Sequence, residues 1–411
     1  MKIAIMSIGD ELMNGFTIDS NSSWIAYEMS NFTSFNIISK ITTKDNEDDI
    51  VNNLDYLLTL KPNYIFITGG LGPTHDDITK NILSKYFDSK LIVNEAYYLR
   101  LKNYLDSKNI EYNQTLKTQA EILENSKPIP NRYGTALGMI VTYQDCDIFV
   151  LPGVPKEMKS MIKREIIPSF IESKHNRRKQ FAIILTTGVN ESKLYGLLKE
   201  NIIENQSKFK VSFLPNYTGV KIRLSSIKKG MNLNKFKNSI IGKINNYIYG
   251  FDNDSIENVV SNELILKKLT VALAESCTGG FISKKLTDQP GSSKYFKGSL
   301  VAYDNTVKER LLDISKDILR DKGAVSREVA LAMANNIRKK FNVDIGLSAT
   351  GISGPSGGSE DKPIGLIYIA IATKNDEIVK KFNLIPSRYE HRKIATHTAL
   401  NMLRLFIKQI Y

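Results

Sequence analysis

Cysteine and histidine are scarce in this chain. Its 411 residues include two cysteines, Cys146 and Cys277, and four histidines. Two cysteines cannot build a disulfide framework, and no Cys/His cluster has the spacing of zinc ligands. The composition therefore excludes a small disulfide-stapled or zinc-finger protein, and it favours a reducing compartment.

Long apolar runs are also lacking. No segment approaches the roughly 20 uninterrupted apolar residues that a membrane helix needs. The apolar run at the N-terminus is too short for a secretory signal, because Asp10 and Glu11 follow it at once. We therefore expect a cytoplasmic protein without a membrane partner, whose residues 3–8 form a first β-strand.

Charge is unbalanced but dispersed. Hydrophobic residues make up 42% of the chain and charged residues 24%, which rules out a wholly disordered or low-complexity protein. The formal net charge is +13, yet the lysines are spread along the whole sequence. No basic run is interleaved with aromatic residues, so the charge gives little support for a nucleic-acid partner.

The order of the apolar segments divides the chain into three domains. Short apolar runs alternate with helical patterns over residues 1–171 and again over residues 255–411, as in α/β proteins. Residues 172–254 carry a βαββα pattern with few apolar positions, flanked by polar linkers at 172–180 and 251–254. We predict the α/β class: two three-layer α/β domains with mostly parallel sheets, joined by a small α+β domain.

Continuous apolar runs predict the strands, and periods of 3.6 residues predict the helices. In the first domain strands are expected at 3–8, 36–42, 64–68 and 147–151, and helices at 22–31, 47–60, 76–87, 95–108 and 156–170. In the last domain strands are expected at 270–274, 295–303, 343–350, 365–373 and 378–384, and helices at 256–267, 281–287, 308–312, 327–341 and 391–409. Ligands collect at the carboxyl ends of such strands.

A glycine-rich loop, TGGLGPTHDD, follows the predicted strand at 64–68 and opens a helix. Gly69, Gly70 and Gly72 let a ligand approach the backbone without interference from a Cβ. The helix start then offers free N–H groups and the positive end of a dipole. The pattern predicts a cradle for a phosphate or a pyrophosphate.

Polar side chains follow in the same loop. Thr74, Asp76 and Asp77 suit the N-cap of a helix, so a sharp turn with a good cap is the alternative interpretation. Two carboxylates beside a phosphate would repel it unless a divalent cation lies between them. We therefore expect Asp76 or Asp77 to ligate a divalent metal. Asp10, in the carboxylate pair after the first strand, is expected at the same sheet edge.

These segments carry a first resemblance. The sequences SIGDEL at 7–12, GGLGPTHDD at 69–77 and LPG at 151–153 are similar to the molybdopterin-binding-like N-terminal domain of the CinA family. In that family a small KH-like domain follows, and the two are associated with ADP-ribose pyrophosphatase activity. The resemblance implies substrate contacts at Asp10, Gly69, Gly70, Gly72 and Thr74, and metal ligands at Asp76 and Asp77.

A second candidate site follows the predicted strand at 270–274. The segment AESCTGG opens a helix there and offers two nucleophiles, Ser276 and Cys277. A cysteine hydrolase needs a nearby base, and His391 and His397 of the last helix could reach the motif only through folding. The thiol is therefore one alternative, and a small buried cysteine without a catalytic role is another.

A serine nucleophile also needs a base. Lys308 follows the next predicted strand, whose end would lie beside the Ser276 loop in a parallel sheet. A neutral lysine serves as a base when burial or nearby cations lower its pKa. Arg388 could supply that cationic field or hold a phosphate, and Tyr303 and Asn305 could relay a proton or orient a substrate. The alternative is that the lysine is an ordinary solvated side chain.

A third loop, ATGISGPSGG at 349–358, follows another predicted strand. Its hydroxyl and backbone N–H groups, those of Thr350 and Gly351 among them, suit a phosphate or a carbonyl oxygen. Alternatively, its glycines serve only to turn the chain.

Six segments of the last domain carry a second resemblance. They are AESCTGG at 274–280, PGSS at 290–293, VAYDN at 301–305, GAVS at 323–326, TGISGP at 350–355 and KPIG at 362–365. In this order they are similar to the nicotinamide mononucleotide deamidase domain of the CinA family. The resemblance implies a nucleophile at Ser276, a general base at Lys308 and a catalytic Tyr303, with no cofactor. It implies substrate contacts at Glu275, Cys277, Thr278, Gly279, Asn305, Thr350, Gly351 and Arg388.

The reaction implied is hydrolysis of the carboxamide of nicotinamide mononucleotide to nicotinate mononucleotide and ammonia, a step of pyridine nucleotide salvage. The partners would be small nucleotides: nicotinamide mononucleotide and, at the first site, ADP-ribose. The alternative is a non-enzymatic regulatory protein that binds a nucleotide or a pterin and is linked to competence and DNA uptake. In a third alternative only one half is active. Because a small domain with little core often sits at an interface, we expect a homodimer.

Overall fold

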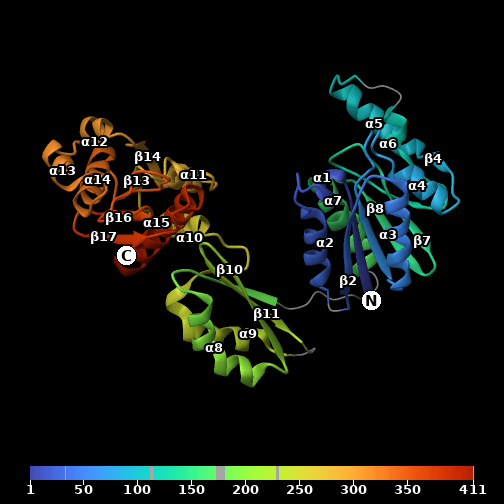
Figure 1. The fold of residues 1–411 in the computed structure, drawn as a ribbon, viewed down its shortest axis with the longest axis horizontal. Helices are drawn as coiled ribbons and strands as arrows, with labels where there is room; N and C mark the ends of the chain where they lie inside the picture. The colour runs from blue at the N-terminus through green and yellow to red at the C-terminus, as the bar shows by residue number, and fades with distance from the viewer. Residues whose placement is uncertain (33, 112–114, 173–180, 228–230, 411) are drawn as a thin grey trace. The chain divides into compact units, whose positions relative to one another are not determined.

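The structure, a computed structural model, describes residues 1–32, 34–111, 115–172, 181–227 and 231–410. The chain divides into two compact units, Met1–Gln180 and Phe181–Tyr411 (Figure 1). Within the described residues, no helix has both the length and the apolar composition to cross a membrane. Residues 173–180, which make up most of the first predicted linker, lie outside the described residues.

A six-stranded sheet forms the centre of the first unit, in the order β2-β1-β3-β8-β7-β6. The strands are β1 (Lys2–Ile8), β2 (Asn36–Thr43), β3 (Tyr64–Thr68), β6 (Lys127–Ile129), β7 (Gly138–Tyr143) and β8 (Cys146–Leu151). The pairs that join β2, β1, β3 and β8 are parallel, whereas β7 and β6 add in antiparallel fashion. β1 and β3 are buried on both faces, which explains their continuous apolar runs.

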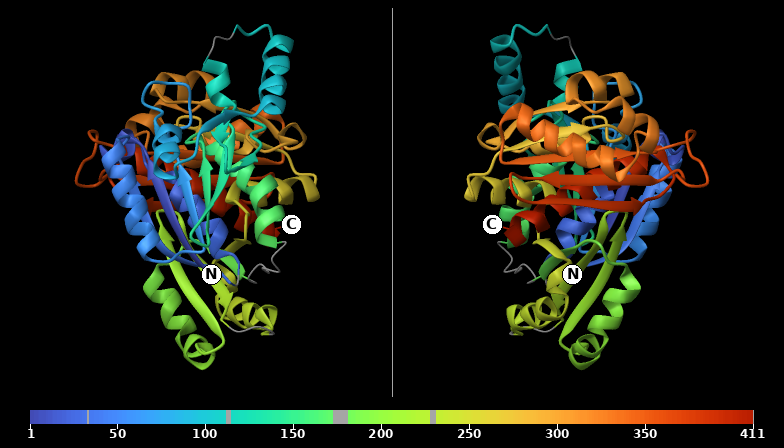
Figure 2. Two further views of the ribbon diagram at one scale, coloured as in Figure 1. Left: turned by 90° about the vertical axis from the view of Figure 1, so that its right-hand side faces the viewer. Right: turned by 90° about the vertical axis from the view of Figure 1, so that its left-hand side faces the viewer.

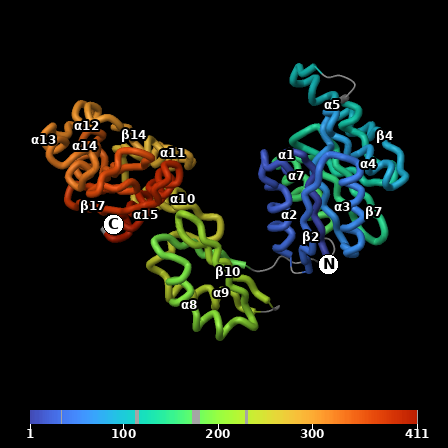
Figure 3. The backbone as a smooth tube through the Cα atoms, viewed as in Figure 1, coloured from blue at the N-terminus to red at the C-terminus, as the bar shows by residue number. Residues whose placement is uncertain are grey.

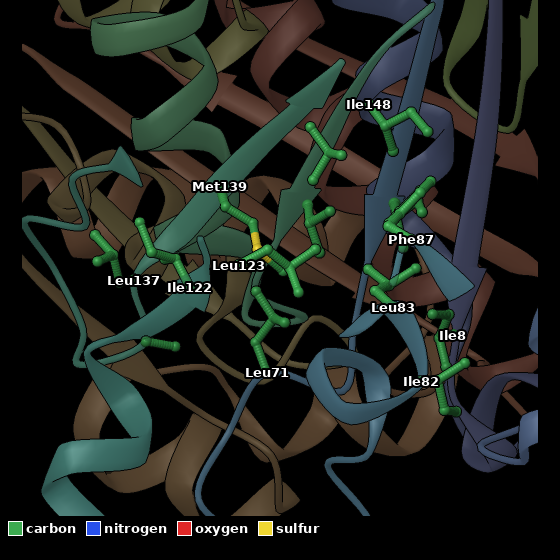
Figure 4. Close-up of a cluster of buried hydrophobic side chains, with 14 of the residues drawn as sticks. Ile8, Leu71, Ile82, Leu83, Phe87, Ile122, Leu123, Leu137, Met139 and Ile148 are labelled. Carbon is green, nitrogen blue, oxygen red and sulfur yellow. The ribbon is translucent and has the colours of Figure 1, made fainter. Parts of the chain in front are cut away.

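Helices cover both faces of this sheet (Figure 2). Alternate residues of β1 point to opposite sides, so Ile5 packs with Met29 of one layer and Met6 with Leu54 of the other. The first layer contains α2 (Ser20–Ser30), α7 (Pro155–Met161) and η1 (Ile162–Glu172); the second contains α3 (Glu47–Thr59), α4 (Thr79–Tyr86) and α5 (Glu95–Ser107). Figure 4 shows part of the core under the second layer. The predicted three-layer architecture is confirmed.

Short elements complete the first unit. They are the helices α1 (Asp10–Met13) and α6 (Thr115–Gln119) and a small antiparallel sheet of β4 (Leu91–Val93) and β5 (Glu121–Leu123). All of them except α1 lie, with β6 and β7, in residues 91–143, where the apolar pattern predicted only one helix, at 95–108.

The structure corrects the helix predicted at 76–87. α4 begins at Thr79, because the Asp77 carboxylate folds back and accepts hydrogen bonds from the amides of Gly72 and Thr74 at 2.7 and 2.9 Å. No side chain caps the helix. The N-cap interpretation of this loop is therefore wrong, and the loop closes on itself before the helix begins.

A small antiparallel α+β domain begins the second unit. Its elements are β9 (Phe181–Thr186), α8 (Glu191–Asn205), β10 (Phe209–Asn216), β11 (Gly219–Ser226), α9 (Leu233–Ile244), η2 (Asn245–Tyr247) and β12 (Ile248–Phe251). The strand order is β10-β11-β9-β12, and both helices pack into one core. The predicted βαββα pattern is present, with β12 as an additional strand.

The second predicted linker, at 251–254, is a hydrogen-bonded turn. The Asp252 amide donates to the carbonyl of Ile183 at 2.9 Å, and the Asp252 carboxylate accepts from the Ile183 amide at 2.9 Å. The turn is thereby tied to β9, and the small domain and the last domain together form one compact unit.

The last domain, coloured from yellow-orange to red in Figure 3, is built on a five-stranded sheet in the order β14-β13-β15-β16-β17. The strands are β13 (Val271–Glu275), β14 (Phe296–Val301), β15 (Ile345–Gly351), β16 (Leu366–Ala372) and β17 (Glu377–Asn383). β14, β13 and β15 are parallel, whereas β16 and β17 are antiparallel because they follow by direct connections that need no crossover helix. The sheet is therefore mixed, and parallel only around β13.

Helices again form a layer on each side of this sheet. One layer is α14 (Arg327–Phe341), and the other comprises α10 (Ile256–Leu266), α11 (Phe281–Thr287) and α15 (Arg388–Ile410). The short helices η3 (Ser292–Lys294), α12 (Asn305–Leu312) and α13 (Lys316–Lys322) lie at the ends of the connections. This arrangement leaves the carboxyl ends of β13, β14 and β15 at one edge, where the candidate catalytic residues lie.

Phe149 provides a test of the first core. Its ring is fully buried in β8, stacks on Phe66 with centroids 4.8 Å apart, and contacts Tyr64 and Phe170. We expect Phe149→Ala to lower the free energy of unfolding of the first unit by about 3–5 kcal/mol, because a cavity replaces the ring. Urea unfolding of the full chain measures the loss. The control Tyr56→Ala, at a largely exposed ring, should change it by less than about 0.5 kcal/mol; equal losses would contradict the packing.

Candidate active site

The turn after β13 places Ser276 at the carboxyl edge of the sheet. β13 ends at Glu275, and the Ser276 amide still donates to the carbonyl of Ala349 in β15 at 2.9 Å. The chain then turns through Gly279 and Gly280, whose φ angles of +57° and +90° suit glycine. Ser276 is buried, so its hydroxyl lies within the domain and not in bulk solvent.

Glu275 holds this turn from within. It is fully buried, and its carboxylate accepts hydrogen bonds from the amides of Gly280, Ile282 and Ser283 at 2.9, 3.2 and 2.8 Å. The Ser283 hydroxyl is a fourth donor. These donors belong to the start of α11, where a carboxylate is favoured by the helix dipole. Both oxygens are committed to the fold, so the contacts of Glu275 are those of a positioning residue and not of a substrate ligand.

Lys308 of α12 has a buried amine. The residue is 1% exposed, and its Nζ donates to the carbonyl oxygens of Ala302 and Tyr303 at 2.7 and 3.0 Å. Burial lowers the pKa of Lys308 below its ordinary value, and the nearby carboxylate of Asp304 opposes part of that shift. The interpretation as a solvated surface lysine is therefore wrong.

The sheet register brings the Lys308 amine to the Ser276 turn. The Ala302 amide donates to the carbonyl of Glu275 at 2.8 Å, which is the last rung between β13 and β14. In a continued parallel ladder the Ala302 carbonyl would next accept from the Cys277 amide. Lys308 Nζ occupies that acceptor instead, and its charge acts on the pKa of the Cys277 thiol. The amine therefore lies where the Ser276 turn leaves the sheet.

The same turn holds polar groups that the fold does not use. The amides of Ser276 and Gly279 bond to carbonyls within the fold. The amides of Cys277 and Thr278 lie against the cysteine sulfur. The Thr278 hydroxyl is fully buried, and it has no hydrogen-bond partner in the part of the chain that the structure describes. The turn thus offers two N–H groups and one hydroxyl to an oxyanion or a polar substrate group.

Cys277 lacks the surroundings of a nucleophilic thiol. Burial raises its pKa to about 12, so the thiolate is scarce at neutral pH. Both histidines of α15 are engaged elsewhere: Nδ1 of His391 bonds to the Ser353 hydroxyl at 2.9 Å, and Nε2 of His397 bonds to the Thr187 hydroxyl at 3.1 Å. The cysteine packs in the hydrophobic core instead, as expected of a small buried residue.

Two arginines of α15 face the loops around the turn. Arg388 donates to the carbonyl of Gly354 and to the hydroxyl of Tyr303, both at 3.0 Å. Arg392 donates to the carbonyl of Thr278 through Nε at 3.3 Å and Nη2 at 3.0 Å. These guanidinium groups form a cationic wall suited to an anionic substrate group. Tyr303 is 58% exposed, and its hydroxyl accepts the hydrogen bond from Arg388.

The remaining predicted contacts of this site have different surroundings. Asn305 begins α12 and is exposed. The Thr350 hydroxyl is buried and donates to the carbonyl of Ala324 at 2.9 Å. Gly351 ends β15, where an added Cβ would lie 2.6 Å from the carbonyl oxygen of Leu366. Thr350 and Gly351 therefore shape the loop. Of these three residues, Asn305 alone has an exposed side chain that could contact a substrate.

A cavity lies over the glycine loop of the first unit. Its volume is about 390 Å³. Gly69 and Gly70 have φ angles of +120° and +66°, and a Cβ at Gly69 would lie 2.2 Å from the carbonyl oxygen of Ile8. Only glycine fits this close approach. The predicted residues that line the cavity are Gly69, Gly70, Gly72, Asp76 and Asp77.

This cavity is acidic. The carboxylates of Glu11, Asp45, Asp76, Asp77 and Glu157 line it, and within the described residues no lysine or arginine does. Burial raises the pKa of Asp45, and the neighbouring carboxylates add to that rise. An anionic ligand would therefore meet repulsion unless a cation accompanied it.

The metal expected at Asp76 and Asp77 finds no preformed site. Asp77 accepts hydrogen bonds from its own loop, and Asp76 is exposed. Over the residues that the structure describes, no group of three or more His, Cys, Asp or Glu side chains could hold a metal ion. The residues present do not fit a resident metal, and no chemical step follows from one.

Two predicted residues, Asp10 and Thr74, do not line the cavity but form hydrogen bonds with residues that do. Asp10 and Asp45 exchange hydrogen bonds, each amide donating to the other carboxylate at 3.0 and 3.2 Å. Thr74 donates to Asp77. The sequence interpretation missed Asp45 and Glu157, which come from separate segments with no motif around them, so only the folded chain brings them to the glycine loop.

Comparisons with known proteins follow the same division. The CinA C-terminal domain matches residues 253–407, and the probable molybdopterin binding domain matches residues 4–172. A CinA-like protein of Geotalea uraniireducens is 36% identical, with 98% of this chain and 97% of that protein covered. A CinA-like protein of Cytophaga hutchinsonii is also 36% identical, over 99% and 98%.

A solved structure resembles one part of the chain. The competence/damage inducible protein CihA of Agrobacterium tumefaciens is 33% identical over 38% of this chain and 98% of its own, with a TM-score of 0.36. The relatives that match along almost the full length carry more weight, because they are more than 30% identical over both domains and the segment between them. By this similarity the chain belongs to the CinA family.

Proposed function

We propose that the last domain is an amidohydrolase that converts nicotinamide mononucleotide and water into nicotinate mononucleotide and ammonia. The observation that carries the proposal is the buried amine of Lys308, held just after the end of β14, which pairs with the end of β13 from which the Ser276 turn departs. Family membership is compatible with a hydrolase but does not name the substrate. The geometry supports a Ser/Lys mechanism.

The hydrogen bonds of Lys308 suit a general base. A neutral amine carries two hydrogens and one lone pair. The carbonyls of Ala302 and Tyr303 accept both hydrogens, so the lone pair remains for the proton of the Ser276 hydroxyl. Burial lowers the pKa of Lys308, which keeps a larger fraction of the amine neutral at a given pH.

The reaction then proceeds through an acyl-enzyme. Ser276 Oγ attacks the carboxamide carbon as Lys308 takes its proton, and the amides of Cys277 and Thr278 hold the oxyanion. Lys308 returns the proton to the departing nitrogen, which leaves as ammonia. Water attacks the ester as Lys308 takes its proton, the bond between the acyl carbon and Ser276 Oγ breaks, and Lys308 returns the proton to Oγ as nicotinate mononucleotide is released.

The arginines supply binding for the other end of the substrate. Arg388 and Arg392 lie one helical turn apart on α15, and both reach loops at the edge of the site. Guanidinium groups bind phosphate oxygens through paired N–H groups. We assign the 5′-phosphate to this wall, with the pyridine ring toward Ser276.

Single substitutions separate the serine from the cysteine. We expect Ser276→Ala and Lys308→Met each to lower ammonia release by at least roughly a thousandfold without unfolding the chain, because each removes a group that acts on the reacting atoms. Cys277→Ser should keep most of the activity. Ammonia and nicotinate mononucleotide are measured with circular dichroism as a control. Loss in Cys277→Ser with activity in Ser276→Ala would move the role to the thiol, and inactive wild-type protein would favour the non-enzymatic alternative.

The pH dependence of kcat/KM tests the proposal that Lys308 is the base. Lys308 acts only when neutral, so kcat/KM should rise with pH through its pKa and level off above it, with a midpoint below the ordinary lysine value of 10.5. Asp304 opposes the lowering of that pKa. Asp304→Asn, which keeps a side-chain oxygen for the cap of α12, should therefore move the midpoint to lower pH. A midpoint at or above 10.5, or one unmoved by the substitution, would contradict the assignment.

The first unit supports a second proposal, hydrolysis of the pyrophosphate of ADP-ribose over the glycine loop. The observation that favours it is a cavity of about 390 Å³ into which the loop backbone opens. Five carboxylates line the same cavity, so a diphosphate would need a cation to enter with it.

Metal dependence tests this second proposal. We expect turnover of ADP-ribose only with added Mg²⁺ or Mn²⁺, and its loss with excess EDTA, because the acidic cavity repels a bare diphosphate. AMP and ribose 5-phosphate are followed by chromatography. Ammonia release from nicotinamide mononucleotide in the same samples should not respond to EDTA. Metal-independent turnover of ADP-ribose would contradict the electrostatic argument.

A further inference from the structure

A cavity lies between the small domain and the last domain, within the second unit. Its volume is about 580 Å³. Four segments line it: the connection from β9 to α8, the turn between β10 and β11, one face of β17 and one face of α15. Neither Ser276 nor Lys308 is among the lining residues, so the proposed amidase reaction does not account for this cavity.

Apolar side chains form the wall that the last domain supplies. Ile378 and Phe382 lie on one face of β17, since alternate residues of a strand point to the same side. On α15, Met402 and Leu405 belong to one face, because residues three or four apart in a helix are neighbours. Ile378, Phe382 and Leu405 are only half-buried, so a ligand that covers them removes further apolar surface from water.

His397 of α15 is a buried polar residue of the lining, only 9% exposed. Its Nε2 pairs with the Thr187 hydroxyl at 3.1 Å, and that hydroxyl donates to the carbonyl of Thr218 at 2.8 Å. The Thr187 hydroxyl has one hydrogen, so it accepts from His397, and Nε2 is the ring nitrogen that carries the hydrogen. The Tyr249 ring packs edge-on against the imidazole, with centroids 5.5 Å apart. These two contacts hold the orientation of the imidazole.

The other ring nitrogen of His397 is left as an acceptor. Burial lowers the pKa of His397 to about 4, so the ring is neutral at neutral pH and Nδ1 carries a lone pair. Among the described residues, Nδ1 has no hydrogen-bond donor. A polar atom on a largely buried side chain destabilises the folded state when it lacks a partner, so a donor from outside the chain is expected at this nitrogen.

We propose that this cavity binds a neutral, largely apolar molecule that carries a hydroxyl or N–H group, which donates to Nδ1 of His397. The apolar body of the molecule covers the side chains of β17 and α15. Cavities of roughly 300–1,000 Å³ with mostly apolar walls and a few polar groups are typical binding sites for small organic molecules. The cavity between the two domains has this size and this lining.

Charge favours a neutral ligand. In the part of the chain that the structure describes, the lining includes one cation, Lys380, and one anion, Glu191, and both are exposed. An anionic group at His397 would face the lone pair of Nδ1 and not a hydrogen. A charged group would also leave water for apolar surroundings that hold no buried counter-charge. The site is independent of the amidase and pyrophosphatase proposals, because it requires binding and no bond cleavage.

The probe is 2-naphthol, with 2-methoxynaphthalene as the matched analogue that lacks the donor. We expect the full chain to bind 2-naphthol roughly three- to tenfold more tightly than the analogue, the value of one uncharged hydrogen bond. In His397→Gln the side-chain amide can still donate to Thr187, but the acceptor at the position of Nδ1 is gone. The preference for 2-naphthol should therefore disappear while the thermal midpoint stays close to that of the wild type. Isothermal titration measures both ligands against both proteins.

A matched pair of substitutions tests the apolar wall. Leu405→Arg places a charged side chain in the cavity and should weaken the binding of both ligands at least roughly tenfold. The control Leu266→Arg makes the same exchange at a side chain that is 77% exposed and outside the lining, and it should leave both affinities unchanged. Circular dichroism checks the fold of each variant, and the comparison with His397→Gln does not depend on either arginine variant.

Four results would each overturn the site. The first is no binding of 2-naphthol at millimolar concentration. The second is equal affinity of the wild type for the two naphthalenes, which would mean that water already satisfies Nδ1. The third is a preference that His397→Gln leaves intact, and the fourth is equal weakening in Leu405→Arg and Leu266→Arg, which would place the ligand outside the cavity. A failed amidase assay with the expected binding results would leave this proposal standing.

Discussion

The candidate active site of the second unit depends on two hydrogen bonds that one lysine amine donates. Lys308 Nζ is bound by the carbonyls of Ala302 and Tyr303, and Ala302 is itself registered against Glu275 by the last rung of the ladder between β13 and β14. The position of the amine is therefore set by the sheet and not by a flexible side chain. Burial of the same amine lowers its pKa, so a larger fraction of it is neutral at a given pH.

The two units place their candidate sites in the same way but give them opposite charge. In each, strands end at one sheet edge, and glycines with positive φ, such as Gly70 and Gly279, turn the chain there. In the last domain Arg388 and Arg392 surround the turn, whereas carboxylates line the cavity of the first unit. The edge of the last domain is therefore electropositive, and the edge of the first unit is electronegative. Similar topology thus supports different ligands, because the side chains at the strand ends decide the electrostatics.

The sequence predicted the architecture and the turn that carries Ser276 better than the contacts around each site. Local signals were enough for the strand before Ser276 and for the glycine loop, because a buried strand followed by a tight turn has a short-range signature. They singled out Lys308 only through the expected parallel pairing of the next strand, and its buried environment became apparent from the register of β14 against β13. They did not reveal Asp45 and Glu157, which reach the first cavity from separate segments. The start of α4 was misplaced because Asp77 bonds to its own loop, a local competition that periodicity does not register.

Orphaned hydroxyl groups connect these observations. Ser7 and Thr278 are both fully buried at the carboxyl ends of central strands, and neither hydroxyl finds a partner in the described residues. Ser348, at the same depth in β15, donates to the carbonyl of Ala330 at 2.5 Å, so the fold is able to satisfy a buried serine where no ligand is expected. A buried hydroxyl without a hydrogen-bond partner destabilises the folded protein until water or a ligand supplies one. Both hydroxyls lie at the sheet edges to which the sequence motifs and the charge distribution had already pointed.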